Sequence, residues 1–303
     1  MSEIIIQTDH LTKDYGKGRG VFDISLDVRR GEVYGYIGTN GSGKTTTIRH
    51  LIGFLQADAG NATVMGMDTW KDSLKIKPYM SYVPGEIAFP GLKTGTDFLK
   101  LQAEYLGITD YTYMNHLIKI LQLDPTANLK RMSKGMKQKT ALVAALMGDR
   151  DILVLDEPTT GLDPLMRDVF LELIREEKSK GKTIFMSSHI FEEIESVCDR
   201  AAMIKDGHIV NVLDVYNLRH KKNKHYIAEF KDKTDAQKFA NQCRYAKCEL
   251  NQNICHIYIE MASTPELLKH LSEYPLLSLS EQRENLETAF YKEFAKGVNE
   301  HGK

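Results

Sequence analysis

The amino-acid sequence predicts an α/β domain with a parallel sheet, followed by a smaller α+β domain. Three observations support this prediction. Short apolar segments alternate with amphipathic helical segments through roughly the first 215 residues, the pattern of a parallel sheet covered by helices. A glycine-rich turn at residues 38–45 joins one of these strands to a helix. The strand pattern then restarts after a basic stretch at residues 219–224.

The first domain, residues 1–218, is predicted from its alternating elements. Strands are expected where apolar residues cluster or alternate with polar ones, and helices where apolar residues recur every three or four positions. Gly107 and the pair Asp124-Pro125 are expected to end helices, and Asp206-Gly207 to turn a hairpin. The expected strands are 4–6, 21–28, 32–37, 151–155, 183–187, 201–205 and 208–213, and the expected helices are 46–52, 96–106, 113–121, 135–147 and 164–180.

The second domain, residues 225–303, follows a basic linker at residues 219–224, for which a membrane-surface patch is the alternative. Its elements follow the βαββαβ order of a ferredoxin-like arrangement. Cys255 and His256 are adjacent on a strand, so they point to opposite faces and cannot chelate together. We expect a regulatory or interaction module, with a stabilising appendage as the alternative. The expected strands are 226–230, 247–250, 254–259 and 276–279, and the expected helices 235–242, 265–274 and 285–296.

Composition excludes several classes of protein. The 303 residues carry a net charge of −1, so bulk electrostatics do not point to nucleic acid. No apolar run approaches the ~18 residues of a membrane span, and the start of the chain has no secretory signal. The four cysteines show no paired or metal-binding spacing, which indicates reduced thiols. We therefore expect a cytoplasmic protein.

The segment Gly38 to Thr45 matches G-x-x-x-x-G-K-[ST], the phosphate-binding P-loop. Its glycines let successive backbone N–H groups face one point, and the following helix N-terminus adds its dipole. Lys44 is expected to reach the β- and γ-phosphates of ATP or GTP, and the Thr45 hydroxyl to ligate Mg²⁺. The expected nucleotide-binding residues here are Gly38, Thr39, Asn40, Gly41, Ser42, Gly43, Lys44, Thr45 and Thr46.

Two acids, Asp156 and Glu157, end the apolar strand that begins at Asp151. In P-loop ATPases an Asp at this position holds Mg²⁺, and the Glu that follows would be the general base for the attacking water. Two acids after a strand also commonly begin a helix. The pair is therefore interpreted as a metal ligand and a general base because a P-loop lies upstream. The sequence thus predicts a site that binds and hydrolyses a nucleotide.

Residues 131–139, residues 158–163, His189 and Tyr15 are four further features that resemble one family, the ABC (ATP-binding cassette) ATPases. Residues 131–139 resemble its LSGGQ signature, residues 158–163 its D-loop, His189 its switch histidine, and Tyr15 the aromatic residue that stacks on adenine. The resemblance covers about residues 3–215 and implies a RecA-like core, a helical subdomain and an antiparallel β subdomain. The alternatives for single residues are an exposed aromatic for Tyr15 and a helix cap for His189.

The resemblance implies a mechanism with two cassettes paired head to tail, as a homodimer or a heterodimer. Each ATP would lie between the P-loop of one cassette and Ser133 and Gly135 of the other, although Ser133 could equally be an N-cap. His189 would contact the γ-phosphate, so the expected catalytic residues are Lys44, Glu157 and His189. The chain has no membrane span, so a separate integral membrane permease is the implied partner.

The sequence departs from the family pattern in two places. The signature has Met132, Lys134 and Met136 where the family usually shows Leu, Gly and Gln, while Ser133 and Gly135 remain. The backbone donors and the hydroxyl survive, so we expect function to survive. Residues 80–86 align with the family's Q-loop, and Gly85 stands where a Gln usually contacts Mg²⁺ and water. Gly85 and Glu86 are therefore candidates for a coupling loop.

The details of these motifs and the small C-terminal domain are most similar to bacterial exporter ATPases for drugs, antimicrobial peptides and lipid-linked substrates. The implied location is the inner face of the cell membrane, through the permease. The alternatives are an importer ATPase, a soluble ABC ATPase that acts on ribosomes or DNA, and an interaction module without turnover. Glu157 argues against the last, and a single P-loop with a short stretch before the signature argues against the ribosomal class.

Overall fold

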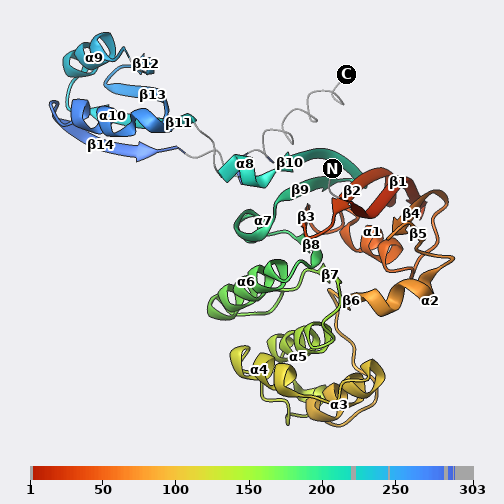
Figure 1. Cartoon of the computed structure of the whole chain (residues 1–303). Coiled ribbons are helices and arrows are strands. Elements are labelled where there is room, and N and C mark those ends of the chain that lie inside the picture. The colour runs from red at the N-terminus through yellow and green to blue at the C-terminus, as the bar shows by residue number, and fades with distance from the viewer. Residues whose placement is uncertain (1–2, 220–222, 245, 283–285, 289, 291–303) are drawn as a thin grey trace. The chain divides into compact units, whose positions relative to one another are not determined.

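The computed structural model describes residues 3–219, 223–244, 246–282, 286–288 and 290 (Figure 1). The chain divides into two compact units, Met1–Val215 and Tyr216–Lys303, and each is described by itself. Half of the predicted linker at 219–224, namely residues 220–222, lies outside the described residues. Most of the predicted final helix at 285–296 lies outside them as well, namely residues 285, 289 and 291–296. None of the helices among the described residues is both long enough and apolar enough to cross a bilayer.

The core of the first unit is a six-stranded sheet in the order β10-β9-β3-β8-β7-β6. Neighbouring strands run parallel except at the β9–β10 hairpin. Every residue of β3, β7 and β8 is buried, as expected for parallel strands covered on both faces. The predicted α/β fold is confirmed. The strands are β3 (Val33–Ile37), β6 (Met80–Val83), β7 (Ile152–Asp156), β8 (Thr183–Ser188), β9 (Arg200–Lys205) and β10 (His208–Asp214).

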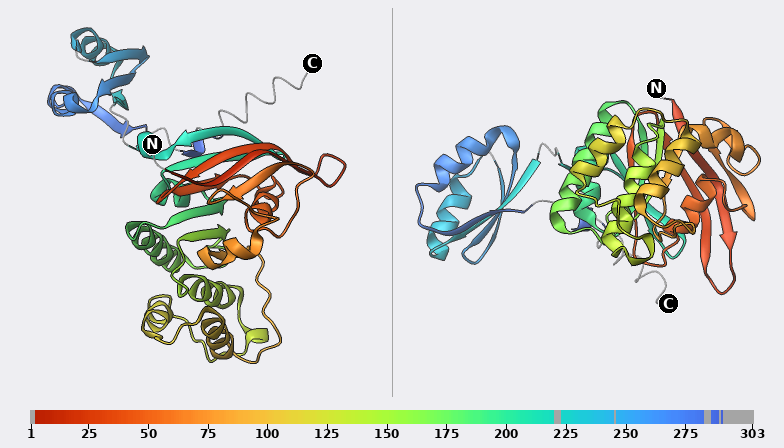
Figure 2. Two further views of the ribbon diagram at one scale, coloured as in Figure 1. Left: turned by 45° about the vertical axis from the view of Figure 1, so that its right-hand side comes forward. Right: turned by 90° about the horizontal axis from the view of Figure 1, so that it is seen from below.

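A second, antiparallel sheet lies beside the first, in the order β2-β1-β4-β5 (Figure 2). It comprises β1 (Ile4–Asp14), β2 (Gly20–Arg29), β4 (Ala59–Val64) and β5 (Met67–Asp68). Side chains of both sheets, among them Ile24, Tyr36 and Phe185, form one buried cluster with helix α1 (Lys44–Leu51). The sequence indicated only residues 4–6 of β1 and missed β4 and β5, because those segments are polar and are held by backbone pairing.

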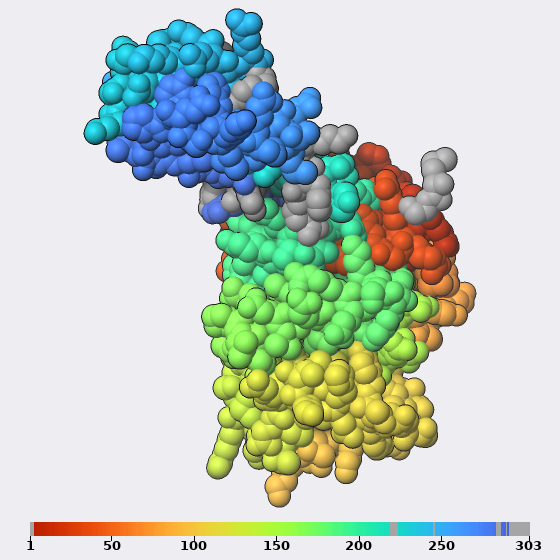
Figure 3. All heavy atoms as spheres, turned by 60° about the vertical axis from the view of Figure 1, so that its left-hand side comes forward, coloured from red at the N-terminus to blue at the C-terminus, as the bar shows by residue number. Residues whose placement is uncertain are grey.

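A helical segment leaves the six-stranded sheet after β6 and returns at β7, and it lies at one end of the unit (Figures 1 and 3). Thr94 and Asp97 form a capping box at the start of α3, and Gly107 ends that helix in the left-handed conformation, as predicted. The short helices α2 (Ser73–Ile76) and η1 (Lys77–Tyr79) precede β6, and η2 (Leu129–Arg131) directly precedes the last helix of the segment. Its main helices are α3 (Gly95–Leu106), α4 (Thr112–Ile120) and α5 (Lys134–Leu146).

Two helices cover the remaining part of the parallel sheet, α6 (Pro164–Ser179) after β7 and α7 (Phe191–Val197) after β8. Asp163 caps α6 by accepting a hydrogen bond from the Met166 backbone N–H at 3.0 Å, and Pro164 opens the helix. The short helix α7 was not predicted, since its seven residues hold little periodic signal.

A buried carboxylate ties the helical segment to the core. Glu177 of α6 is fully buried and accepts hydrogen bonds from the Tyr113 hydroxyl of α4 at 2.7 Å and from Lys180 at 2.6 Å. Lys182, also buried, pairs with it. Burial alone would raise the pKa of Glu177, but the hydrogen bonds that its carboxylate accepts outweigh burial and hold the pKa below its ordinary value of 4.5.

We therefore expect Glu177→Ala to lower the free energy of unfolding by roughly 3 kcal/mol, because it removes the buried partner of the Lys182 ammonium and leaves that buried charge with the exposed carboxylate of Asp149, 2.6 Å away. Because the folded-state pKa is lowered, this stabilisation is present above pH 4.5 and is lost as the pH falls through the lowered pKa. The difference from wild type should thus shrink in acid. Urea titrations followed by the fluorescence of Trp70, the one tryptophan, measure it. An equal loss in the exposed-neighbour control Glu176→Ala would contradict the assignment.

The second unit contains an antiparallel sheet in the order β12-β13-β11-β14, with helices α9 and α10 on one face (Figure 2). Its chain order is the predicted βαββαβ. Phe239 of α9 and Leu267 of α10 pack on Phe230 and Ile257 of the strands in a separate hydrophobic core. The elements are α8 (Val215–Arg219), β11 (Asn223–Phe230), α9 (Lys233–Gln242), β12 (Lys247–Asn251), β13 (Ile254–Glu260), η3 (Met261–Ser263), α10 (Thr264–Leu271) and β14 (Leu276–Glu281).

Candidate active site

The glycine-rich loop lies between β3 and α1 and has no room for a side chain at two of its glycines, Gly38 and Gly43. A Cβ on Gly38 would lie 2.4 Å from the Ser42 Oγ, and one on Gly43 would lie 2.7 Å from a Val21 methyl. Gly43 also has a φ of 110° where it caps α1, a conformation that favours glycine. The loop therefore curls tightly at a helix N-terminus, which suits the phosphates of a nucleotide.

Lys44 lies over this loop with its ammonium held by the backbone. Its side chain is 5% exposed, and Nζ donates to the carbonyl oxygens of Gly38 at 2.8 Å and of Thr39 at 3.1 Å. The same Nζ lies 3.2 Å from the Glu157 Oε1. A buried positive charge is thus fixed at the mouth of the loop and is paired with the predicted general base.

Thr45 and Asp156, the two residues expected to ligate Mg²⁺, are in direct contact. The Thr45 hydroxyl donates to the Asp156 Oδ2 at 2.7 Å, and the Ser187 hydroxyl donates to the other carboxylate oxygen at 2.6 Å. Asp156 itself is 1% exposed. Hydroxyl and carboxylate oxygens are the ligands that Mg²⁺ prefers, so these residues fit a magnesium ion.

Ser187 is a site residue that sequence reasoning did not identify. Its hydroxyl accepts a hydrogen bond from the Glu157 backbone N–H at 3.0 Å while donating to Asp156, so it fixes both acids. The available signal was its place at the carboxyl end of a buried strand, because the carboxyl ends of neighbouring parallel strands share one edge. The pairing of Asp156 with Ser187 in the β7–β8 register shows this directly.

Glu157 stands at the centre of the predicted catalytic residues. Besides Lys44, its carboxylate lies 3.4 Å from the Nδ1 of His189 and accepts a hydrogen bond from the Thr160 hydroxyl at 3.3 Å. Its φ is 47°, in the left-handed region, which is strained for a residue with a side chain. Strained backbone clusters at functional sites, and here it aims the carboxylate at Lys44 and His189.

Three residues that were predicted to contact a nucleotide lie away from this cluster. Tyr15 is 48% exposed near the tip of the β1–β2 hairpin, and among the described residues it makes no hydrogen bond to the P-loop. Ser133 and Gly135 lie at the start of α5, and Ser133 caps that helix by accepting from the Met136 backbone N–H at 3.2 Å. The N-cap interpretation of Ser133 is thus present in the structure, and the residue remains exposed.

Helix α5 is instead bound closely to the loop after Glu157. The buried amide of Gln138 donates to the Pro158 carbonyl oxygen at 2.7 Å. A Cβ on Gly135 would lie 2.6 Å from the carbonyl oxygen of Gly161. Gln138 was not identified from the sequence, because its role depends on the position of a loop 20 residues away.

Gly85 lies against the metal-ligand candidate. A Cβ on Gly85 would be 3.3 Å from the Asp156 Oδ2, whereas Glu86 is exposed. The segment aligned with the Q-loop therefore approaches Asp156 through its backbone.

Comparison with known proteins gives one consistent result. The family model described as "ABC transporter" matches residues 21–160. The chain is 30% identical to the bacitracin transport ATP-binding protein BcrA of Bacillus licheniformis, over 95% of this chain and 96% of that protein. It is 34% identical to the linearmycin resistance ATP-binding protein LnrL of Bacillus subtilis, over 69% of this chain and 68% of that protein.

Solved structures give the same result. A solved structure of the ATP-binding subunit of an ABC transporter superposes on this chain with a TM-score of 0.63 at 28% sequence identity. The superposition covers 72% of this chain and 92% of the solved chain. A dimeric ATP-binding cassette in a post-hydrolysis state with ADP and Pi has a TM-score of 0.62 at 19% identity, covering 70% of this chain and 99% of its own, and supports the fold alone.

Proposed function

This chain belongs to the family of ABC transporter ATP-binding proteins, and from that premise we propose that it drives export through a separate membrane permease by hydrolysing ATP. Its ATPase assignment follows from the family. The observation that carries the residue roles is the convergence of Lys44, Glu157 and Asp156 at the carboxyl edge of the parallel sheet.

In the proposed mechanism, the P-loop backbone and Lys44 hold the phosphates, and Thr45 and Asp156 hold Mg²⁺. The metal ion supplies a positive charge for the phosphate oxygens. Glu157 accepts the proton of the attacking water, and His189 lies on the opposite side of its carboxylate from Lys44. Ser187 keeps Asp156 and Glu157 in register, since it bonds the side chain of one and the backbone of the other.

We further propose that two cassettes pair head to tail around ATP, either as two copies of this chain or with a related chain. The start of α5 supports this arrangement. Ser133 is exposed at the N-terminus of a helix of 13 residues. A helix N-terminus favours phosphate, so Ser133 and Gly135 would meet the ATP of the partner cassette. Tyr15 would stack on adenine.

The names of the similar proteins favour export over import. They include proteins named for bacitracin transport, linearmycin resistance and Nod factor export, and the first spans nearly the whole chain. An importer or a ribosome-bound ATPase remains the competing function. The net charge of −1 offers no general attraction to nucleic acid. We place the protein at the inner face of the cell membrane through its permease.

Affinity purification of the tagged chain from a detergent extract tests this proposal. Recovery of an integral membrane subunit encoded with an export system supports it. Recovery of ribosomal proteins in its place would favour the competing class. The Lys44→Ala variant, which should not bind ATP, serves as a control for nucleotide-dependent capture.

The chain should be monomeric in solution without nucleotide, because the proposed pair is held largely by two shared ATP molecules. Adding ATP to the Glu157→Gln variant should convert monomer to dimer. Light scattering coupled to size exclusion measures both states. A tight dimer in the absence of ATP would contradict this and would point to the second unit as the dimer seam.

Removing residues 225–303 should leave nucleotide binding intact, because every residue assigned to the phosphates or the metal precedes residue 190. We propose that this part acts in partner assembly or in regulation of the ATPase rate. Titration with a fluorescent ATP analogue measures the affinity, and circular dichroism checks that the shortened chain is folded. A folded cassette that cannot bind ATP would overturn either the domain boundary or the site assignment.

A further inference from the structure

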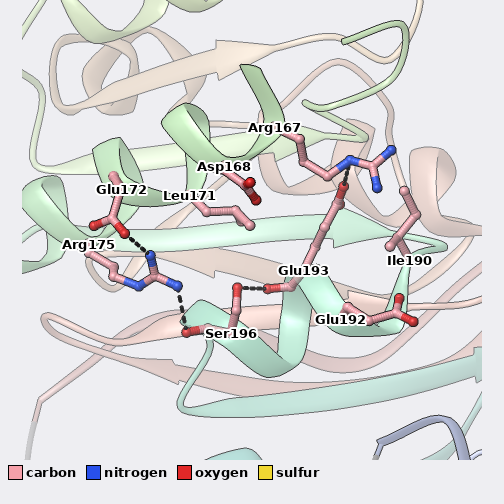
Figure 4. A pocket seen from close by; sticks show the side chains of 9 residues that line it. All are labelled: Arg167, Asp168, Leu171, Glu172, Arg175, Ile190, Glu192, Glu193 and Ser196. Atoms are coloured by element: carbon pink, nitrogen blue, oxygen red, sulfur yellow. Dashed lines mark hydrogen bonds and ion pairs between the residues drawn. The ribbon is translucent and has the colours of Figure 1, made fainter. Parts of the chain in front are cut away.

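A groove with a cavity volume of about 590 Å³ separates α6 from α7, and a buried acid lies at its floor (Figure 4). This acid is Glu193 of α7, which is 1% exposed. Neither the P-loop nor Asp156 touches it. Burying a carboxylate is costly unless strong hydrogen bonds or an opposite charge compensate, so its partners indicate what it does.

On one side Glu193 controls the turn that carries His189. The Ser188 hydroxyl donates to the Glu193 Oε2 at 2.8 Å, and the same hydroxyl accepts a hydrogen bond from the Ile190 backbone N–H at 3.0 Å. A hydroxyl has one proton to donate. Because that proton is taken by the carboxylate, the Ser188 lone pairs are oriented to close the turn around His189.

On the other side Glu193 reaches the helix that follows Glu157. Its Oε1 lies 3.1 Å from the Nε of Arg167, in the first turns of α6 (Figure 4). That helix is capped by Asp163, the last residue of the loop that begins directly after Glu157. The Glu193 carboxylate thus connects the turn that carries His189 to helix α6, which follows the proposed general base Glu157.

A role in stability alone explains this poorly. Replacing a buried ion pair with apolar side chains is often neutral or stabilising, so such a pair is weak evidence for stability. His189 and Glu157 lie on different elements, and their 3.4 Å separation depends on both being held. Misplacing a catalytic group by about 1 Å can cost about 100-fold in rate.

We propose that Glu193 is a positioning residue, which sets the place of His189 relative to Glu157 through Ser188 and Arg167. This inference rests on the proposed role of His189 at the γ-phosphate. It adds an acid outside the nucleotide site to the groups on which turnover depends.

The test compares Glu193→Ala with Glu192→Ala in the full chain, since Glu192 lines the same groove but is exposed. We expect Glu193→Ala to lower kcat by about 10-fold to 100-fold while the KM for ATP and the ATP affinity stay unchanged. Glu192→Ala should keep wild-type kcat. In a His189→Ala background, Glu193→Ala should add little further loss, because coupled residues are not additive.

A second measurement does not depend on activity. In protein labelled with ¹³C-histidine, the imidazole signal assigned to His189 should shift in Glu193→Ala and stay in place in Glu192→Ala. If Glu193→Ala fails to fold, Ser188→Ala breaks the same link at its other end, and Ser188→Thr should restore kcat by retaining the hydroxyl.

Wild-type kcat in folded Glu193→Ala, or an equal loss with and without His189, would overturn the inference. An unchanged His189 signal would overturn it as well. If His189→Ala itself keeps full turnover, the proposed role of His189 fails, and the imidazole signal alone then decides whether Glu193 positions that residue.

Discussion

Glu157→Gln is expected to stop ATP turnover while ATP still binds. Glutamine keeps the size of the side chain and its hydrogen-bonding reach, but it cannot accept the proton of the attacking water. Loss of a general base costs ~10²–10⁴ in rate. The amide can still meet Lys44, His189 and Thr160, whose groups surround the carboxylate. The left-handed backbone at this position is no harder for glutamine than for glutamate.

Phosphate release measures the loss of turnover, and size exclusion with ATP should show the variant accumulating as a dimer. Glu86→Gln is the matched control, because Glu86 is an exposed glutamate in the segment aligned with the Q-loop. It should keep near-normal activity. Near-normal hydrolysis by Glu157→Gln would move the general base elsewhere, to Glu86 or His189.

Lys44→Ala should remove ATP binding and leave the fold intact. Hydrogen bonds to charged groups contribute about 1.5–3 kcal/mol each, which is roughly 10-fold to 150-fold in affinity for each bond lost. Because the ammonium is expected to reach both the β- and the γ-phosphate, these losses multiply and should remove measurable binding. Lys44 is buried and bonded to two loop carbonyls, so part of the loss will come from a loosened loop.

A fluorescent ATP analogue measures the affinity, and circular dichroism with thermal melting checks the fold. Lys75→Ala is the control, since Lys75 is an exposed lysine on α2 that forms an ion pair with Asp72, the N-cap of that short helix. Unchanged affinity in folded Lys44→Ala would mean that the phosphate site has been misplaced.

The sequence was most informative where function depends on contiguous residues. The P-loop needs glycines at fixed spacing between a strand and a helix, so its pattern alone located the turn, Lys44 and Thr45. Asp156 and Glu157 were found in the same way, as the end of an apolar strand. The order of elements in the second unit also followed from alternation.

Other features depend on tertiary neighbours and have no local signal. Ser187 bonds Asp156 because two parallel strands are adjacent, and Gln138 acts on a distant loop. The left-handed backbone of Glu157 is set by its surroundings, since glutamate has no preference for it. The strands β4 and β5 were missed because these short, largely polar segments are held by backbone pairing.

The close approach of Gly135 to Gly161 limits which amino-acid substitutions the signature segment of this chain can accept. A side chain on Gly135 would meet the Gly161 carbonyl, and a Cβ on Gly161 would meet the stem of Lys134 at 2.9 Å. Met132 is buried and Lys134 is exposed, so both positions tolerate exchange within their class. Substitutions in the signature can therefore accumulate around Gly135, as they have here, but a change at Gly135 has to wait for a change in the loop that faces it.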